Sequence, residues 1–308
     1  QTRTGWGLRS LFACVIVSAV ALTGCGDVLD EIAKQNAGGK PAVTASVPPR
    51  VRAAGDPVRI ATFNIQVFGT SKMEKSEVVD VLVKVVRRFD IVAIQEIRSK
   101  DQTVLPRFVD QINADGSRYD FVIGPRLGRT SSKEQYAYIF DTRRIELDAD
   151  SVWTVPDPSD RLHREPLVAR FRVRGVPPER AFTFTLIDIH NDPDETTEEL
   201  YTLDEVYVAV QQSSPREDDV ILLGDLNVDD RHLGQLGRLP DMFWVISGRT
   251  TNTRRNKQYD NIIFNQVATT EYTGVGGVLD LQDEFGLSLD EALDVSDHNP
   301  VWAEFSPI

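Results

Sequence analysis

Polar side chains that can bind a hard cation or move a proton stand at one end of six short apolar runs. These side chains are Asn64, Glu96, His190, Asp225 with Asn227, Asp260, and Asp297 with His298. A strand holds such groups on a rigid backbone, and residues two apart on a strand share a face, as Asp225 and Asn227 do. Carboxylate and amide oxygens with two imidazoles suit a hard divalent cation and proton transfer. The sequence therefore predicts a phosphoester-cleaving site where these strand ends converge.

The charge balance limits the classes of partner. Among 308 residues, 34 Lys and Arg stand against 47 Asp and Glu, a formal net charge of -13. This disfavours a protein that binds nucleic acid through bulk positive charge. It does not exclude nucleic acid as a substrate, because a metal site and a few arginines can hold phosphates locally. The composition favours an enzyme that releases its substrate quickly.

The elements that must position these groups form one large predicted domain over residues 58–308, and 41% of the chain is hydrophobic, enough for a sizeable core. Helical spacing predicts helices at Lys75–Arg88, Thr103–Ala114 and Thr196–Gln212. Strands are predicted at Arg59–Asn64, Ile91–Gln95, Phe121–Ile123, Gln135–Phe140, Leu167–Val173, Ala181–His190, Val220–Gly224, Asn261–Phe264 and Val301–Phe305. Strand meanders without regular β-α-β alternation predict an α+β fold, with two packed β-sheets flanked by helices.

Residues 1–24 have the pattern of an export signal. Arg3 and Arg9 form a basic start, and Leu11–Leu22 is an apolar segment. At about 1.5 Å per residue this segment is too short for a hydrocarbon layer of about 30 Å. We therefore expect a cleaved signal peptide and not a membrane-spanning anchor.

The signal ends in Leu22-Thr23-Gly24-Cys25, which resembles the lipobox of bacterial lipoproteins. The resemblance implies a lipidated Cys25 that anchors the protein in the outer membrane, while an ordinary secreted protein remains the alternative. Residues 25–57 are rich in Ala, Gly, Pro and Val and are predicted to be a flexible linker. Both cysteines, Cys14 and Cys25, precede the folded part, so no disulfide is expected there.

Seven segments, in chain order, resemble the deoxyribonuclease I branch of the endonuclease/exonuclease/phosphatase superfamily. They are Phe63–Gly69, Arg87–Glu96, Leu127–Tyr136, Arg164–Pro166, Gly224–Asn227, Tyr259–Asp260 and Ser296–His298. Lys133-Glu134-Gln135-Tyr136 and the opening Phe-Asn-Ile-x-x-Phe-Gly are specific to this branch. The resemblance implies a four-layer sandwich and a monomeric, metal-dependent endonuclease that hydrolyses DNA and leaves 5′-phosphate ends.

The resemblance also implies the acid and base groups. His190 would pair with Glu134 and His298 with Asp260, and Asp225 would position the attacking water. A carboxylate on one ring nitrogen raises the basicity of the other, so one imidazole can take a proton from water while the second protonates the leaving 3′ oxygen. The sequence leaves open which histidine has which task.

Glu96 and Asp297 are the implied metal ligands, with Asn64 as a further ligand or as an amide donor. Mg²⁺ is the expected cation, and Ca²⁺ or Mn²⁺ are alternatives. Asn227 would donate to the substrate phosphate. The implied DNA-contacting arginines are Arg98, Arg129 and Arg164.

Other residues near these motifs carry weaker expectations. A basic loop beside Asp260 is expected to hold flanking phosphates, with plain solvation as the alternative, and comprises Arg254, Arg255 and Lys257. His163 and His232 lie in polar stretches and are predicted to be solvated and not catalytic. Ser132 stands where the family inserts an aromatic ring into the minor groove, so a different cleavage preference is expected.

Two other functions compete with a nuclease. A lipid or small-phosphoester hydrolase of the same superfamily, similar to a sphingomyelinase, would have no use for the three arginines. A catalytically inactive surface-binding module would not need the complete set of site residues. Both alternatives are therefore disfavoured.

Overall fold

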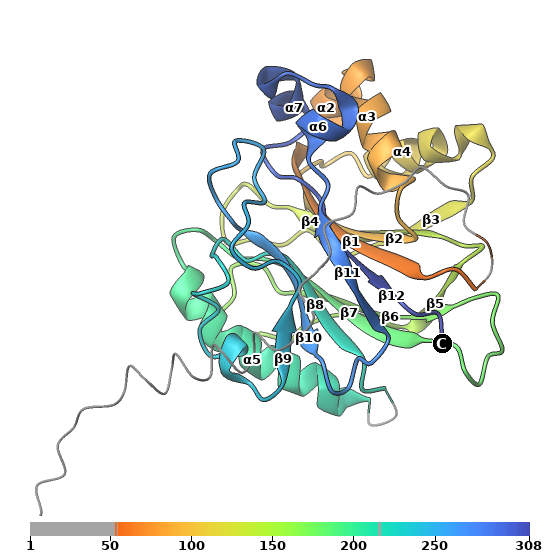
Figure 1. Ribbon diagram of the computed structural model, residues 1–308. Coiled ribbons are helices and arrows are strands. Elements are labelled where there is room, and N and C mark those ends of the chain that lie inside the picture. The colour runs from red at the N-terminus through yellow and green to blue at the C-terminus, as the bar shows by residue number, and fades with distance from the viewer. Residues whose placement is uncertain (1–52, 54, 215–216) are drawn as a thin grey trace, which may run out of the picture. The chain divides into compact units, whose positions relative to one another are not determined.

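The computed structural model describes residues 53, 55–214 and 217–308. The predicted signal peptide, Cys25 and nearly all of the predicted linker lie outside these residues. The described chain contains two six-stranded sheets, and each combines parallel and antiparallel pairs (Figure 1). The predicted pair of sheets is confirmed.

Neighbouring strands in each sheet are often far apart in the chain. The first sheet runs β11 (Tyr272–Val278), β12 (Val301–Phe305), β1 (Val58–Phe68), β2 (Ile91–Ile97), β4 (Gln135–Asp141) and β3 (Tyr119–Ile123). The second runs β5 (Ile145–Thr154), β6 (Leu167–Val173), β7 (Thr183–His190), β8 (Val220–Asp225), β10 (Asp260–Asn265) and β9 (Met242–Trp244). The pairs β1–β2 and β7–β8 are parallel.

Helices cover the outer faces of the sheets (Figure 1). Beside the first sheet lie α2 (Thr70–Met73), α3 (Ser76–Val86), α4 (Val104–Ile112), α6 (Leu281–Phe285) and α7 (Leu289–Val295). Beside the second lies α5 (Thr196–Ser213). The chain also forms two short 3-10 helices, η1 (Asn113–Asp115) directly after α4 and η2 (Leu236–Arg238) between β8 and β9. The order helix, sheet, sheet, helix confirms the four-layer sandwich. Among the described helices, none combines the length and the apolar character needed to cross a membrane.

The central strands are buried on both faces, which explains their continuous apolar sequences. In β1, Val58 and Ile60 pack between the two sheets, whereas Ala61 and Phe63 pack under the helices. The core between the sheets is rich in aromatic rings; Phe171, for example, contacts other rings at centroid distances of 5.4 to 5.8 Å. This packing gives the strand ends a rigid support.

The three predicted helices are confirmed as α3, α4 and α5, and every predicted strand is present. Three strands, β5, β9 and β11, and three α-helices, α2, α6 and α7, were not predicted. β5 is an edge strand with the exposed residues Asp148 and Asp150, so it lacks a continuous apolar run. The helix α7 has a readable signal, the capping box of Ser288 and Glu291.

Gly276 explains why β11 has no strand-like sequence. A Cβ at this position would lie 2.6 Å from Cγ1 of Val245 and 2.7 Å from the backbone oxygen of Trp302. Only glycine allows this close approach. The requirement comes from residues distant in the chain, so the local sequence does not reveal it.

A buried polar chain links the two sheets behind the strand ends. The Nε2 atom of Gln95 in β2 donates to Oδ1 of Asp188 in β7 and, at 2.9 Å, to the hydroxyl of Thr62 in β1. Asp188 is fully buried, and burial raises the pKa of its carboxyl well above the usual range. The folded protein therefore holds this proton to a higher pH than the unfolded chain does.

Asp188→Asn should flatten the pH dependence of stability. An acid with a raised folded-state pKa loses stability as pH rises from its unfolded pKa, near 4, towards its folded pKa, with a slope of about 1.4 kcal/mol per pH unit. In urea unfolding at pH 5 to 8, the free energy of unfolding should fall less steeply with pH in Asp188→Asn than in the native protein, because the variant lacks this one titrating group. Asp110→Asn, at an exposed position of α4, is the control. Equal slopes in all three proteins would contradict the prediction.

Candidate functional site

The strand register brings the acidic and imidazole groups of the second sheet side by side. His190 of β7 lies opposite Asp225 of β8, and Asp225 lies opposite Asp260 of β10. In the first sheet, Asn64 of β1 pairs with Gln95 of β2, which places Glu96 next to it. The predicted convergence of strand ends is therefore present in the structure.

The backbone at these ends adopts unusual conformations. Gly224 has φ 146°, and a Cβ there would lie 2.0 Å from the backbone oxygen of Ile189. Asn227 and Glu96 have φ 55° and 62°, in the left-handed region that few residues other than glycine occupy. Such strain is found at functional sites, where the surrounding structure holds it in place.

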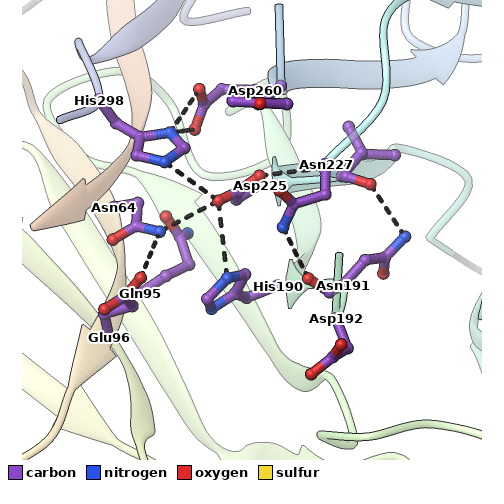
Figure 2. A network of polar contacts seen from close by, with 12 residues as sticks. Asn64, Gln95, Glu96, His190, Asn191, Asp192, Asp225, Asn227, Asp260 and His298 are labelled. Carbon is purple, nitrogen blue, oxygen red and sulfur yellow. Dashed lines mark hydrogen bonds and ion pairs between the residues drawn. The ribbon is translucent and has the colours of Figure 1, made fainter. Parts of the chain in front are cut away.

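Asp225 is the centre of the site (Figure 2). Its Oδ2 atom accepts from Nδ2 of Asn64 at 3.0 Å and faces Nε2 of His298 at 3.4 Å and Nε2 of His190 at 3.6 Å. Its Oδ1 atom accepts from the backbone N–H of Asn227 at 3.0 Å. The carboxyl group is buried, so these donors replace water around it. One carboxylate thus collects groups from both sheets.

The first imidazole is held by a buried carboxylate. Nδ1 of His190 donates to Oε1 of Glu134 at 2.6 Å. Burial raises the pKa of Glu134, but His190, Arg164 and Arg98 together outweigh burial and lower it. Burial lowers the pKa of His190, whereas Glu134 and Asp225 raise it, and the net shift is upward. The predicted pair is present, and its free nitrogen points at Asp225.

The second imidazole has the same arrangement. Nδ1 of His298 donates to Oδ2 of Asp260 at 2.9 Å, and that oxygen also accepts from the hydroxyl of Thr251 at 2.7 Å. Burial lowers the pKa of His298, but Asp260 and Asp225 raise it well above the usual range. Two imidazoles, each backed by a carboxylate, therefore aim their Nε2 atoms at one point. This arrangement can take up and release protons on two sides of a substrate.

Asn64 is placed as a donor. Its Nδ2 atom donates to Oε1 of Glu96 at 3.1 Å and to Asp225, while its oxygen accepts from the backbone N–H of Gln66 at 2.9 Å. Of the two roles left open by the sequence, this orientation favours the amide donor over the metal ligand.

Two groups of donors fit a hard cation. In the first group, the resemblance implies Glu96 and Asp297, and an oxygen of Asp297 is buried without a hydrogen-bond partner among the described residues. Burial lowers the pKa of Lys72, and the negative charges of Asp297 and Glu96 both oppose this effect. In the second group, potential ligand atoms of Asp225, Asp260 and His298 all lie within 4.8 Å of one another. Oxygen-rich groups of this kind suit a divalent ion such as Mg²⁺.

Arg164 has different contacts from those predicted. The sequence resemblance implies a DNA-contacting arginine, but its side chain is only 5% exposed. Its Nε atom contacts Oε1 of Glu134 at 2.9 Å and donates to the backbone oxygen of His190 at 3.0 Å. In this structure Arg164 supports the Glu134–His190 pair from within the protein.

The other two predicted arginines remain partly exposed. Arg98 contacts Glu96 at 3.0 Å, and Arg129 contacts Asp160 at 3.0 Å and also pairs with Glu195. Both side chains are 29% exposed, so each can still reach a phosphate by exchanging a partner.

The remaining histidines lie outside the cluster around Asp225. His232 is exposed and pairs with Asp229, as expected of a solvated residue. The prediction that His163 is solvated is wrong: it is buried, and its Nδ1 atom lies 3.3 Å from Asp192. Its polar sequence neighbours concealed this packing.

The predicted basic loop is only partly available. Arg255 is bound to Asp280, the N-cap of α6, at 2.7 and 2.8 Å, and also to Asp283. Arg254 and Lys257 are exposed and form no ion pair within the described chain. Arg255 therefore anchors the loop, and the other two cations are free to meet a ligand.

Lys72 is a residue that the sequence analysis missed. Its ammonium group donates to the backbone oxygens of Ile65, Gln66 and Val295 at 2.8, 2.6 and 2.8 Å. Burial lowers its pKa to about 8. These bonds tie the end of β1 to the segment that leads to Asp297. Nothing in the local sequence indicates contacts to a segment so far along the chain.

The sequence matches known proteins over most of the described chain. The model of the endonuclease/exonuclease/phosphatase family matches residues 61–298. Deoxyribonuclease-1 of Bos taurus is 32% identical over 264 residues, which cover 79% of this chain and 90% of that protein. Deoxyribonuclease gamma of Rattus norvegicus is 29% identical over 261 residues, which cover 79% of this chain and 83% of that protein.

Solved structures show the same fold. A humanized TDP2 of D. rerio matches with a TM-score of 0.56 and 16% identity, covering 81% of this chain and 99% of that one. The human Nocturnin catalytic domain matches with a TM-score of 0.55 and 14% identity, covering 83% and 95%. At these identities the likeness concerns the architecture alone.

Replacing Glu134 by Gln should lower the pKa of His190. Burial lowers the pKa of His190, and the negative charge of Glu134 raises it. The substitution removes this charge, so the neutral imidazole becomes favoured. The chain has 4 histidines, which keeps an NMR titration of the ring protons tractable. Asp110→Asn, at an exposed position of α4, is the control and should leave the titration of His190 unchanged. An unchanged titration of His190 in Glu134→Gln would contradict the electrostatic assignment.

Proposed function

This chain belongs to the endonuclease/exonuclease/phosphatase family, and we propose that it is a divalent-metal-dependent endonuclease that hydrolyses DNA and leaves 5′-phosphate ends. The observation that carries the proposal is the approach of two carboxylate-backed imidazoles to Asp225, with Nε2 distances of 3.4 and 3.6 Å (Figure 2). The relatives named as deoxyribonucleases favour DNA as the substrate.

In the proposed reaction, Asp225 orients a water molecule for in-line attack on phosphorus. His190 and His298 stand on two sides of Asp225, so one accepts the proton of the water and the other protonates the leaving 3′ oxygen. Proton transfer by a positioned side chain contributes about 10²- to 10⁴-fold to the rate. Glu134 and Asp260 hold the two rings in the required orientation.

The phosphate would be held by amides and arginines. The side-chain amide of Asn64, which donates to Asp225, can donate to a phosphate oxygen instead. The side-chain amide of Asn227 has a second N–H beyond the one that donates to the backbone oxygen of Asn191. Arg98 and Arg129 would bind the flanking backbone. Glu96 and Asp297 would hold the divalent cation, which supplies positive charge to offset the charge that develops on the phosphate oxygens.

A lipid substrate is less well supported. The exposed large apolar side chains of the described residues come singly from separate segments: Val67, Tyr201, Val267, Leu289 and Ile308. A hydrolase acting at a lipid surface needs a continuous apolar patch or loop. The partly exposed arginines suit a polyanionic strand better.

We also propose that the chain is exported and anchored through a lipid on Cys25, on the sequence pattern alone. Cells fed a labelled fatty acid should incorporate the label into the native protein and not into Cys25→Ser. The same variant should appear in the soluble envelope fraction. Equal labelling of both proteins would contradict lipidation at this residue.

Nicking of supercoiled plasmid tests the nuclease. The purified protein should nick the plasmid with Mg²⁺, and EDTA should abolish the activity. His190→Ala and His298→Ala should each lower kcat at least about 100-fold, because each removes one proton-transfer group. Asp110→Asn should leave the rate unchanged.

Two further measurements complete this test. Thermal unfolding of each variant distinguishes lost chemistry from lost folding. Ligation of the nicked product without prior phosphorylation reports 5′-phosphate ends. Sphingomyelin hydrolysis without plasmid nicking, or undiminished nicking by both histidine variants, would refute the proposed function.

A further inference from the structure

A cavity of about 530 Å³ opens beside the site, and of its lining residues the proposed reaction uses only Asn227. It is lined by residues 227–232, 248–250 and 256–259. Asn227 and Tyr259 belong to its wall and also adjoin the site, since they neighbour Asp225 and Asp260 in the chain. The ring of Tyr259 lies 5.8 Å from the ring of His298, centroid to centroid. The cavity therefore adjoins the site around Asp225.

Three cations line the cavity without a partner. Arg231, Arg249 and Lys257 are exposed, and within the described residues none of their side chains forms an ion pair or a hydrogen bond. This contrasts with Arg255, which is bound to two carboxylates. In a chain of net charge -13, an unpaired group of cations at one cavity is a local site for an anion.

The acids of the cavity are already engaged. Asp229 contacts Nδ1 of His232 at 2.5 Å, and Asp230 accepts from the hydroxyl of Ser247 at 2.6 Å and from the backbone N–H of Gly248 at 3.3 Å. Their charge is therefore partly offset by donors of their own. The cations and not the acids are left to interact with a ligand.

We propose that this cavity binds the nucleotide next to the phosphodiester that is cut, with its phosphate held by Arg231, Arg249 and Lys257. The inference rests on the proposed function and specifies how the strand runs through the site. Its volume falls within the range of about 300 to 1,000 Å³ that small-molecule sites occupy. Asn256 and Gln258, which also line it, offer amide groups for the sugar or base.

The contribution of the cavity cations to substrate binding should therefore depend on whether the substrate has a nucleotide next to the phosphodiester that is cut. A substrate with one isolated phosphodiester, such as bis-(p-nitrophenyl) phosphate, leaves the cavity unused. A DNA strand that extends into it gains the contacts of one further phosphate with the cavity cations. These contacts hold the substrate before and during reaction alike, so they lower KM without changing kcat.

The test compares two double variants of equal charge. Arg249→Gln with Lys257→Gln removes two cations of the cavity. Arg118→Gln with Lys84→Gln removes two exposed cations that also lack ion pairs in the described chain and do not line the cavity. Steady-state kinetics are measured with duplex DNA across a range of salt concentrations and with bis-(p-nitrophenyl) phosphate.

The cavity variant should raise KM for DNA about tenfold relative to the control variant, with kcat unchanged. The slope of log KM against log salt should fall by about 1, because the cavity cations neutralise one phosphate of the strand. Hydrolysis of bis-(p-nitrophenyl) phosphate should be the same in both variants. Equal KM changes in the two variants, or an equal loss with the small substrate, would overturn the proposal.

A binding experiment separates this inference from the proposed function. Calorimetry with thymidine 3′,5′-bisphosphate should show weaker binding only in the cavity variant, whether or not the protein cuts DNA. Equal binding by both variants would refute the cavity site even if plasmid is nicked. Failure to nick plasmid, with cavity-dependent binding, would refute only the nuclease.

Oligothymidylates that differ by one nucleotide distinguish a DNA strand from a free nucleotide. Extension towards the cavity should raise kcat/KM in the control variant and not in the cavity variant. If bisphosphate binds but no extension at either end raises kcat/KM, the cavity holds free nucleotides, and the proposed path of the strand is wrong.

Discussion

The buried carboxylate of Asp225 is the constraint on which the site depends. A charge removed from water costs several kcal/mol unless donors compensate it. Here the donors come from both sheets: the amide of Asn64 on β1, the imidazole of His190 on β7, and the imidazole of His298 just before β12. Compensation of this charge therefore requires the two sheets to pack in one relative position. The same packing that stabilises the fold aligns the groups that do the chemistry.

Charged residues around the site hold the groups that face Asp225 in place. Glu134 and Asp260 orient the two imidazoles, and Arg164 supports Glu134 from within the protein. Lys72 binds three backbone oxygens behind the predicted metal ligands, and Arg255 binds the N-cap of α6. These contacts are made before substrate arrives, so little reorganisation is needed during reaction. The strained backbone at the strand ends is tolerated because the apolar layers on both sides of each sheet supply the stability.

The distribution of cations explains how an acidic protein can handle a polyanion. Most of the arginines around the site are engaged with carboxylates, as Arg98, Arg129 and Arg255 are. Three cations without an ion pair in the described chain, Arg231, Arg249 and Lys257, line the cavity beside Tyr259. Attraction for phosphate is then local, while the acidic remainder of the surface limits nonspecific binding. For the proposed DNA substrate, such an arrangement would favour turnover over tight retention.

The sequence by itself determined the types of candidate catalytic group, their place at strand ends, three of the helices and the sandwich of two sheets. These features follow from local apolar periodicity and from motifs of adjacent residues, which a linear pattern contains. Only the tertiary structure decided that Arg164 is buried against Glu134, that Arg255 anchors α6, that His163 is packed, and that β11 requires Gly276. Each of these depends on a contact between segments far apart in the chain. Such contacts arise from strand register and sheet packing, and the local sequence carries no signal for them.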